Sequence, residues 1–381
     1  MGGPLAGVGV VELAGLGAAP FCGMVLADLG AEVVRVDRAD AVVEVGASSA
    51  RSDVLGRGKL SMGVNLKDRR GAEAVLRLVE RSDALIEGFR PGVTERLGLG
   101  PADCLARRRS LVYGRMTGWG QEGPFAPMAG HDIDYIALSG ALHPIGPKER
   151  PALPLNLVGD FGGGGMLLAV GVLAALLQAR ETGAGQAVDA AMVDGSALLT
   201  AQHHGLAAEG RWSREERESN WLDGGAPFYS TYRTADGEHM AVGALEPQFF
   251  AMLLERLEID PAELSPQLDR TGWPHMRDAF AARFGARTRD EWAERFEGSD
   301  ACVAPVLSME EAPGHPHNRA RGVFTTIEGV TQPAPAPRFS VTEPRAPTAP
   351  ASPGRDTDAV MARLGYGPDE IGMLRETGAI A

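Results

Sequence analysis

Residues 8–36 of this chain read VGVVELAGLGAAPFCGMVLADLGAEVVRV. The runs at 8–13 and 32–36 are short, apolar and rich in valine, which is typical of buried strands. The stretch 19–29 between them has the length and the apolar content of a helix. A strand, a helix and a second strand in this order predict a βαβ unit, in which the two strands lie parallel in one sheet.

The same alternation continues along the first half of the chain. Apolar residues stand at helical spacing over 69–81, and further strand-like runs occur at 84–86, 111–113 and 187–191. Repeated βαβ units build a mainly parallel sheet with helices on its faces. We therefore predict an α/β fold whose large domain carries a Rossmann-like sheet.

The composition limits the classes of function that need to be considered. With 381 residues the chain exceeds the usual size of one domain, so a large and a small domain are expected. A formal net charge of −13 argues against general affinity for nucleic acid or anionic membranes. A ligand rich in phosphate would therefore need a local basic pocket.

Cysteine usage and the N-terminus bear on the compartment. The three cysteines are too few and too scattered for a disulfide framework or a zinc site, and the N-terminus lacks the basic start and apolar run of a secretory signal. We expect a protein of the reducing cytoplasm, with no metal site.

A smaller domain is predicted after the sequence GGAP at 224–227. Strand-like runs at 228–232 and 238–243 flank a turn at Asp236-Gly237, which is a hairpin signal. Amphipathic stretches follow at 248–257 and 289–296. The expected ranges are a large domain over 1–190, a helical linker over 191–227, a small α/β domain over 228–297, a return linker over 298–331 and a C-terminal segment over 332–381.

The C-terminal part begins with a proline-rich stretch over 331–353, for which we expect an extended surface connection. Two terminal helices are predicted, at 356–364 and 368–376.

Two patterns have alternative readings. Gly15 and Gly17 after the first strand, with Asp37 after the second, approach a dinucleotide-binding fingerprint, but Pro20 replaces its third glycine. A tight turn in a Rossmann-like sheet explains these residues better than a nicotinamide site.

The apolar stretch over 161–179 is nearly long enough to cross a bilayer, but its glycines and alanines favour a buried helix in the core.

Three separated residues are candidates for acid–base chemistry: His131, Asp160 and Glu246. An imidazole and a carboxylate on opposite sides of a carbon can remove a proton from one face and return one to the other. Each also has a structural alternative. A histidine is often a structural hydrogen-bonding group, Asp160 before the glycines 162–165 could be a helix N-cap, and Glu246 before Pro247 could be a turn residue.

The segments around these residues resemble the family III CoA-transferase superfamily. The similarity runs through GPLAGVGVVELAG (3–15), DLGAEVVRVD (28–37), LIEGFRPGV (85–93) and GWGQEGP (118–124). The segments GHDI (130–133), LNLVGDFGGG (155–164), DAAMVDG (189–195) and GALEPQ (243–248) are similar to the α-methylacyl-CoA racemase branch.

This resemblance implies an interlocked homodimer in which the C-terminal segment packs back on the large domain. The active site would lie between the large domain of one subunit and the small domain of the other, with Glu246 supplied by the partner. The implied substrate is a 2-methyl-branched acyl-CoA, whose (R) and (S) forms are interconverted without a metal or redox cofactor. His131 and Asp160 would exchange the α-proton, Glu246 would orient His131, and the amide of Asp132 would hold the enolate oxygen.

The resemblance also implies a CoA site. Arg38 after the second strand is the first candidate for the phosphates, and a polar loop carrying Arg51, Arg57 and Lys59 could close over the nucleotide. The implied substrate-binding residues are Arg38, Val64, Asn65, Leu66, Lys67, Gly88, Phe89, Arg90, Arg96, Gly130, Asp132, Ile133, Asp134 and Tyr135.

Two other functions remain open from the sequence. A CoA transferase would share the fold and use Asp160 as a nucleophile that forms an acyl anhydride. A non-catalytic acyl-CoA-binding protein would keep the arginines without needing the acid–base residues. The acyl group is not identified by the sequence, although Met192 and Met240 are candidates for an adaptable apolar surface as well as for core packing.

Overall fold

The computed structural model describes residues 2–44, 50–343 and 346–381. They form two compact units. The first unit comprises 1–139, 155–199 and 319–381, and the second unit comprises 140–154 and 200–318. The expected domain ranges differ from these units mainly in that 140–154 belongs with the second unit and 191–199 with the first.

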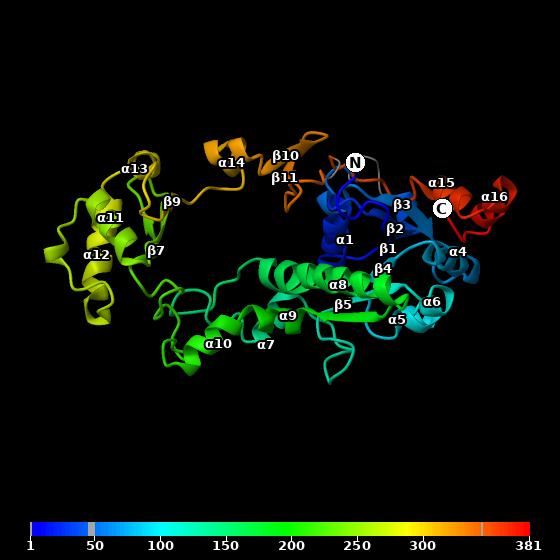
Figure 1. The fold of residues 1–381 in the computed structure, drawn as a ribbon, viewed down its shortest axis with the longest axis horizontal. Coiled ribbons are helices and arrows are strands. Elements are labelled where there is room, and N and C mark those ends of the chain that lie inside the picture. The colour runs from blue at the N-terminus through cyan, green and yellow to red at the C-terminus, as the bar shows by residue number, and fades with distance from the viewer. Residues whose placement is uncertain (1, 45–49, 344–345) are drawn as a thin grey trace. The chain divides into compact units, whose positions relative to one another are not determined.

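The first unit is built on six strands: β1 (Gly9–Leu13), β2 (Glu32–Arg38), β3 (Leu60–Val64), β4 (Ala84–Glu87), β5 (Val112–Thr117) and β6 (Ala187–Ala191). Their order in the sheet is β3-β2-β1-β4-β5-β6, and all neighbours are parallel (Figure 1). This is the strand order of a doubly wound Rossmann sheet, in which ligands bind outside the carboxyl ends of the strands. The predicted α/β fold with a parallel sheet is confirmed.

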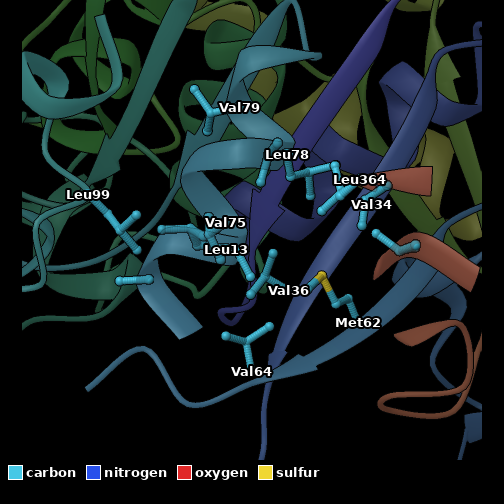
Figure 2. Packing of buried hydrophobic residues seen from close by; sticks show 14 of the residues in the cluster. Leu13, Val34, Val36, Met62, Val64, Val75, Leu78, Val79, Leu99 and Leu364 are labelled. Atoms are coloured by element: carbon cyan, nitrogen blue, oxygen red, sulfur yellow. The ribbon is translucent and has the colours of Figure 1, made fainter. Parts of the chain in front are cut away.

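Helices cover both faces of this sheet. On one face, α1 (Ala18–Asp28) and α8 (Leu167–Thr182) pack against β1, β4 and β5 in one apolar cluster. On the other face, α4 (Arg69–Glu80), α6 (Pro101–Arg107), α15 (Thr357–Arg363) and α16 (Pro368–Glu376) enclose a second cluster (Figure 2). Side chains of β1, β2 and β3 in this cluster, such as Leu13, Val36 and Met62, are almost fully buried. Apolar side chains thus cover both faces of the central strands, which explains why these strands lack a simple alternating pattern.

The C-terminal segment returns to the edge of this sheet. Ile380 forms a bridge with Val64 at the end of β3, and the amide of Asn65 donates to the carbonyl of Ala379 at 3.0 Å. Both terminal helices are found where the sequence predicts them. The proline-rich stretch begins differently, because β11 (Val330–Pro333) pairs with β10 (Phe324–Ile327) as a hairpin.

The remaining elements of the first unit are short. Among the described residues they include α2 (Ala41–Glu44), a 3₁₀ turn (Val54–Gly56), α5 (Val93–Arg96), α7 (Asp132–Leu138), a π-helical segment (Leu157–Met166) and α9 (Met192–Leu199). Helix α14 (Pro316–Arg321) precedes β10.

The π-helical segment and α8 form one continuous helical stretch, Leu157–Thr182. It is the one helix in the described chain that is long and apolar enough, by length and composition, to cross a membrane. Leu168, Val172 and Leu176 on one side of it are buried in the sheet cluster. The predicted core packing of this stretch is confirmed for that side.

Two of the ion pairs buried in the first unit correct one expectation. Lys59 Nζ lies 2.6 Å from Glu12 Oε2 and also donates to the carbonyl of Pro20. Arg57 pairs with the buried Asp28 at 2.5 Å. Arg57 and Lys59 were expected in a polar loop over a nucleotide, but both side chains are almost fully buried. That expectation is wrong, because Arg57 neutralises Asp28 at the end of α1 and Lys59 neutralises Glu12 in β1.

The pair of Lys59 and Glu12 gives a stability prediction. Removing one partner of a buried pair leaves a charge without compensation, so Lys59→Met should lower the free energy of unfolding by about 3–5 kcal/mol. The double variant Glu12→Gln/Lys59→Met removes both charges and should lose much less. Urea unfolding of the three proteins at pH 7 checks this, and equal stability of the single and double variants would contradict it.

The second unit contains an antiparallel sheet of β7 (Tyr229–Arg233), β8 (His239–Gly243) and β9 (Val303–Pro305). Its helices are α10 (Ala201–Ala208), α11 (Pro247–Leu257), α12 (Trp273–Phe284) and α13 (Arg289–Phe296). An aromatic core joins the sheet to α11, α12 and α13, with Tyr232 stacked on Phe284 at 5.1 Å between ring centroids. The predicted hairpin at Asp236-Gly237 is confirmed. Met240 is fully buried in this core, so in this unit it packs the interior.

Candidate active site

A cavity of about 280 Å³ lies at the carboxyl edge of the parallel sheet. The loops after β4 and β5 form its walls, because the carboxyl ends of parallel strands all meet at this edge. It is lined by the predicted segments Gly88–Arg90 and Gly130–His131, together with Tyr135, Trp119 and Met192. The structure therefore brings together the loop predicted to contact CoA and the segment that carries the predicted catalytic His131, which lie about forty residues apart in the sequence.

His131 stands at the N-cap of α7. Its backbone amide donates to Asp134 Oδ2 at 2.9 Å, so Asp134 fixes the start of the helix. The Tyr135 hydroxyl donates to the carbonyl of Gly130, and the Tyr135 ring packs edge-on against Trp119 with 4.7 Å between ring centroids. The backbone that carries His131 is thus held on both sides, while its side chain is exposed.

Asp160 lies inside the π-helical segment, so the N-cap alternative is wrong. The segment begins at Leu157, three residues before Asp160. Asp160 Oδ2 accepts a hydrogen bond from Asn156 Nδ2 at 3.1 Å. Gly17, which precedes α1 with φ of 68°, is so close that a Cβ there would lie 3.2 Å from Asp160 Oδ2. The carboxylate therefore sits between the start of α1 and the start of the long apolar helix.

Asp132 connects the two catalytic candidates. Its Oδ1 accepts a hydrogen bond from the backbone amide of Asp160 at 2.7 Å, and its side chain is only 8% exposed. Burial raises the pKa of Asp132, and the amides of Asp160 and Gly159 oppose this rise by stabilising the carboxylate. A Cβ on Gly159 would lie 2.4 Å from Asp132 Oδ1. One buried carboxylate thus joins the helix start at His131 to the turn that carries Asp160.

Glu246 belongs to the second unit. It is exposed at the N-cap of α11, directly before Pro247 at the first helical position. The pKa of the neighbouring Cys302 thiol is raised by partial burial and by the negative charge of Glu246. His131 and Asp160 therefore share one unit, whereas Glu246 does not belong to it.

Comparison with known proteins identifies the family of the chain. The sequence profile of CoA-transferase family III matches residues 5–358. The chain belongs to this family. It is 47% identical to the α-methylacyl-CoA racemase of Mus musculus over 371 residues, which cover 96% of this chain and 95% of the mouse protein. It is also 47% identical to the α-methylacyl-CoA racemase of Homo sapiens, over 97% of this chain and 96% of the human protein.

Solved structures show the same fold. A CaiB/BaiF family protein from Brucella suis superposes with a TM-score of 0.81 at 25% sequence identity, covering 96% of this chain and all of that chain. The resemblance to family III CoA-transferases and their racemase branch, drawn from separate sequence segments, is confirmed.

The other predicted CoA contacts of this family member lie outside the cavity. Arg38 ends β2, is exposed, and pairs with Asp40, its Nε lying 2.9 Å from Asp40 Oδ1. The segment Val64–Lys67 follows β3 at the same edge of the sheet, where the amide of Lys67 donates to Asn65 Oδ1. Leu66 packs against the core, and Arg96 is exposed at the end of α5.

Ile133 and Asp134 lie in the first turn of α7 and do not line the cavity. Asp37, the acid of the dinucleotide-like pattern, is bonded by Arg35 Nε at 2.9 Å and by Ser61 Oγ at 2.6 Å. These internal bonds occupy the carboxylate that would have to hold a ribose.

Two residues at the site were not predicted. Asn156 contacts Asp160 from four positions earlier, a spacing that brings side chains together once the stretch is helical. Trp119 lines the cavity, and its Nε1 is buried without a partner in the described parts of the chain. Among the described residues, no group of three His, Cys, Asp or Glu side chains is placed to hold a metal ion.

The contact between Gly159 and Asp132 gives a second prediction. Gly159→Ala must displace the Asp132 carboxylate, which should lower the free energy of unfolding by about 1–3 kcal/mol. Gly372→Ala is the control, because Gly372 lies in α16 with no atom within 4 Å of a built Cβ. That change should raise stability by about 0.5–1 kcal/mol. Urea unfolding measures both, and equal effects would show that the 159–132 contact relaxes without cost.

Proposed function

We infer that this chain is an α-methylacyl-CoA racemase, a cofactor-independent isomerase that interconverts (R)- and (S)-2-methylacyl-CoA thioesters. The inference is carried by 47% identity to two such racemases over nearly the whole chain. The site agrees with it, because His131 lines the cavity and the neighbouring Asp132 is hydrogen-bonded to the backbone of Asp160. The family context is that of CoA transferases, so the fold and the CoA site are shared with enzymes of other activity.

The reaction begins with removal of the proton α to the thioester carbonyl. This proton is weakly acidic, so its removal needs a positioned base and a donor to the enolate oxygen. His131 takes the proton from one face while Asp160, in its acid form, delivers a proton to the opposite face. The configuration is thereby inverted, and in the reverse direction the two groups exchange roles.

The enolate oxygen requires a hydrogen-bond donor that is already in place. The backbone amide of Asp132 is the first in α7 and makes no hydrogen bond to any other residue that the structure describes. We assign it this role. Because the proton leaves and returns at the same carbon and no electrons are transferred, the reaction requires no redox carrier.

We further propose that the active protein is an interlocked homodimer in which Glu246 of one subunit orients His131 of the other. A dimer would cover apolar side chains that are exposed on α7, α8 and α9 of the single chain. They are Leu138, Val170, Leu177, Leu198 and Leu199. Apolar surface of this extent commonly marks an interface. A carboxylate beside the imidazole would favour its protonated form.

The function is tested by following a single enantiomer of a 2-methylacyl-CoA in heavy water. The wild-type protein should take up deuterium at the α-carbon and lose chirality. His131→Ala should slow both by about 10²–10⁴-fold, because general acid–base groups contribute on that order. Binding of CoA should persist. CoA transfer to a free carboxylate that depends on Asp160, without α-exchange, would instead identify a transferase.

Subunit complementation tests the shared site. His131→Ala and Glu246→Ala proteins should each be nearly inactive alone. The two proteins are then mixed, unfolded and refolded together. With random pairing, about half of the dimers are heterodimers, and each heterodimer contains one intact site of two, so about a quarter of the wild-type activity should return. Two Glu246→Ala preparations treated in the same way are the control. No recovery in verified heterodimers would show that His131 and Glu246 act within one subunit.

A further inference from the structure

A buried charge cluster stands directly behind the loop Gly88–Arg90. Glu87 ends β4, is fully buried, and immediately precedes this loop. Its Oε2 accepts a hydrogen bond from the amide of Phe89 at 2.6 Å, and its Oε1 accepts one from Arg115 Nε at 3.1 Å. The first turn of the loop is therefore folded back onto the carboxylate of the residue before it.

The same guanidinium also holds the other end of the loop. Arg115 lies opposite Glu87 in the pairing of β4 with β5. Its Nη1 lies 2.9 Å from Glu95 Oε1, and Glu95 belongs to α5, the helix that the loop enters. Arg115 thus joins the strand from which the loop leaves and the helix into which it runs, and the five-residue connection 88–92 is fixed at both ends.

Burying the Glu87 carboxylate costs free energy, so a contribution to stability does not by itself explain this charge cluster. Burial raises the pKa of Glu87 to about 7, against the opposing effects of the Phe89 amide and Arg115. A carboxylate so disfavoured by its surroundings is weak support for the fold, since an apolar pair of the same volume often serves as well. Its bonds are directed to the loop backbone and to one cation, so the cluster specifies a loop conformation.

We propose that Glu87, acting through Arg115 and the Phe89 amide, is a positioning residue that holds Gly88–Arg90 in the conformation that binds the CoA part of the substrate. This inference rests on the proposed function only in taking CoA as the ligand of the loop. Glu87 is fully buried behind the loop and does not line the cavity. Its loss therefore weakens ligand binding and leaves the proton transfer at His131 and Asp160 unchanged.

The test is Glu87→Gln, which keeps the shape of the side chain. An amide has one acceptor oxygen where the carboxylate used two, so either the Phe89 amide or Arg115 loses its partner. Calorimetric titration with free CoA should give about tenfold weaker binding, as expected for one charge-assisted hydrogen bond. KM for the acyl-CoA should rise by the same factor with kcat unchanged, which is the signature of lost ground-state binding.

Asp28→Asn is the matched control. It weakens a different buried arginine–carboxylate pair, that of Asp28 with Arg57, which contacts neither the loop nor the cavity. It should lower thermal stability but leave CoA affinity unchanged. If Glu87→Gln fails to fold, Glu95→Gln removes the outer partner of Arg115 and should show a smaller loss of CoA affinity in the same direction.

Wild-type CoA affinity in the Glu87 and Glu95 variants, with or without reduced stability, would overturn the proposal. A fall in kcat at unchanged CoA affinity would overturn it as well. The CoA titration does not depend on turnover, so the racemase function and the positioning role of Glu87 are tested independently. A protein that binds CoA in a Glu87-dependent way but exchanges no α-proton would refute the racemase function and leave the positioning role in place.

Discussion

Close backbone approach along residues 159–165 is the constraint on which the candidate site depends. A Cβ on Gly163 would lie 2.7 Å from the amide nitrogen of Ser196, and one on Gly165 would lie 2.7 Å from the carbonyl oxygen of Ala18. Only glycine permits such contacts without displacing a neighbour. The π-helical segment can therefore lie against α1 and α9 at backbone distance, and this contact carries Asp160 to the edge of the sheet.

The polar groups of the site divide according to burial. His131 is exposed at the cavity and Asp160 is partly exposed, whereas Asp132 and Glu87 are buried and bonded to backbone amides of the segments in front of them. Exposed groups can reach a substrate, and buried groups hold the backbone that presents them. The buried carboxylates of this acidic chain are compensated by backbone amides or by Arg115.

Local patterns predicted the elements well where local residues determine them. The strands of the sheet are continuous apolar runs, and α13 and α16 begin and end at the predicted residues or within one of them. Predictions failed where a distant contact decides. Arg57 and Lys59 look like exposed loop cations in the sequence, but in the structure they are buried in ion pairs with Asp28 and Glu12. Asp160 before four glycines looks like an N-cap, but the helix starts earlier because those glycines fit against Ala18 and Ser196.

The sequence by itself determined the alternation of strands and helices, the family, and the identity of the acid–base candidates, since these follow from side-chain periodicity and from motifs contained in short segments. The tertiary structure alone decided which loops meet at the cavity, that Asp132 ties the start of α7 to Asp160, and that Arg115 clamps both ends of the loop after β4. The contacts of Asp132 and of Arg115 join residues from 20 to 28 positions apart. No local pattern encodes them, because they arise only when parallel strands bring their carboxyl ends to one edge.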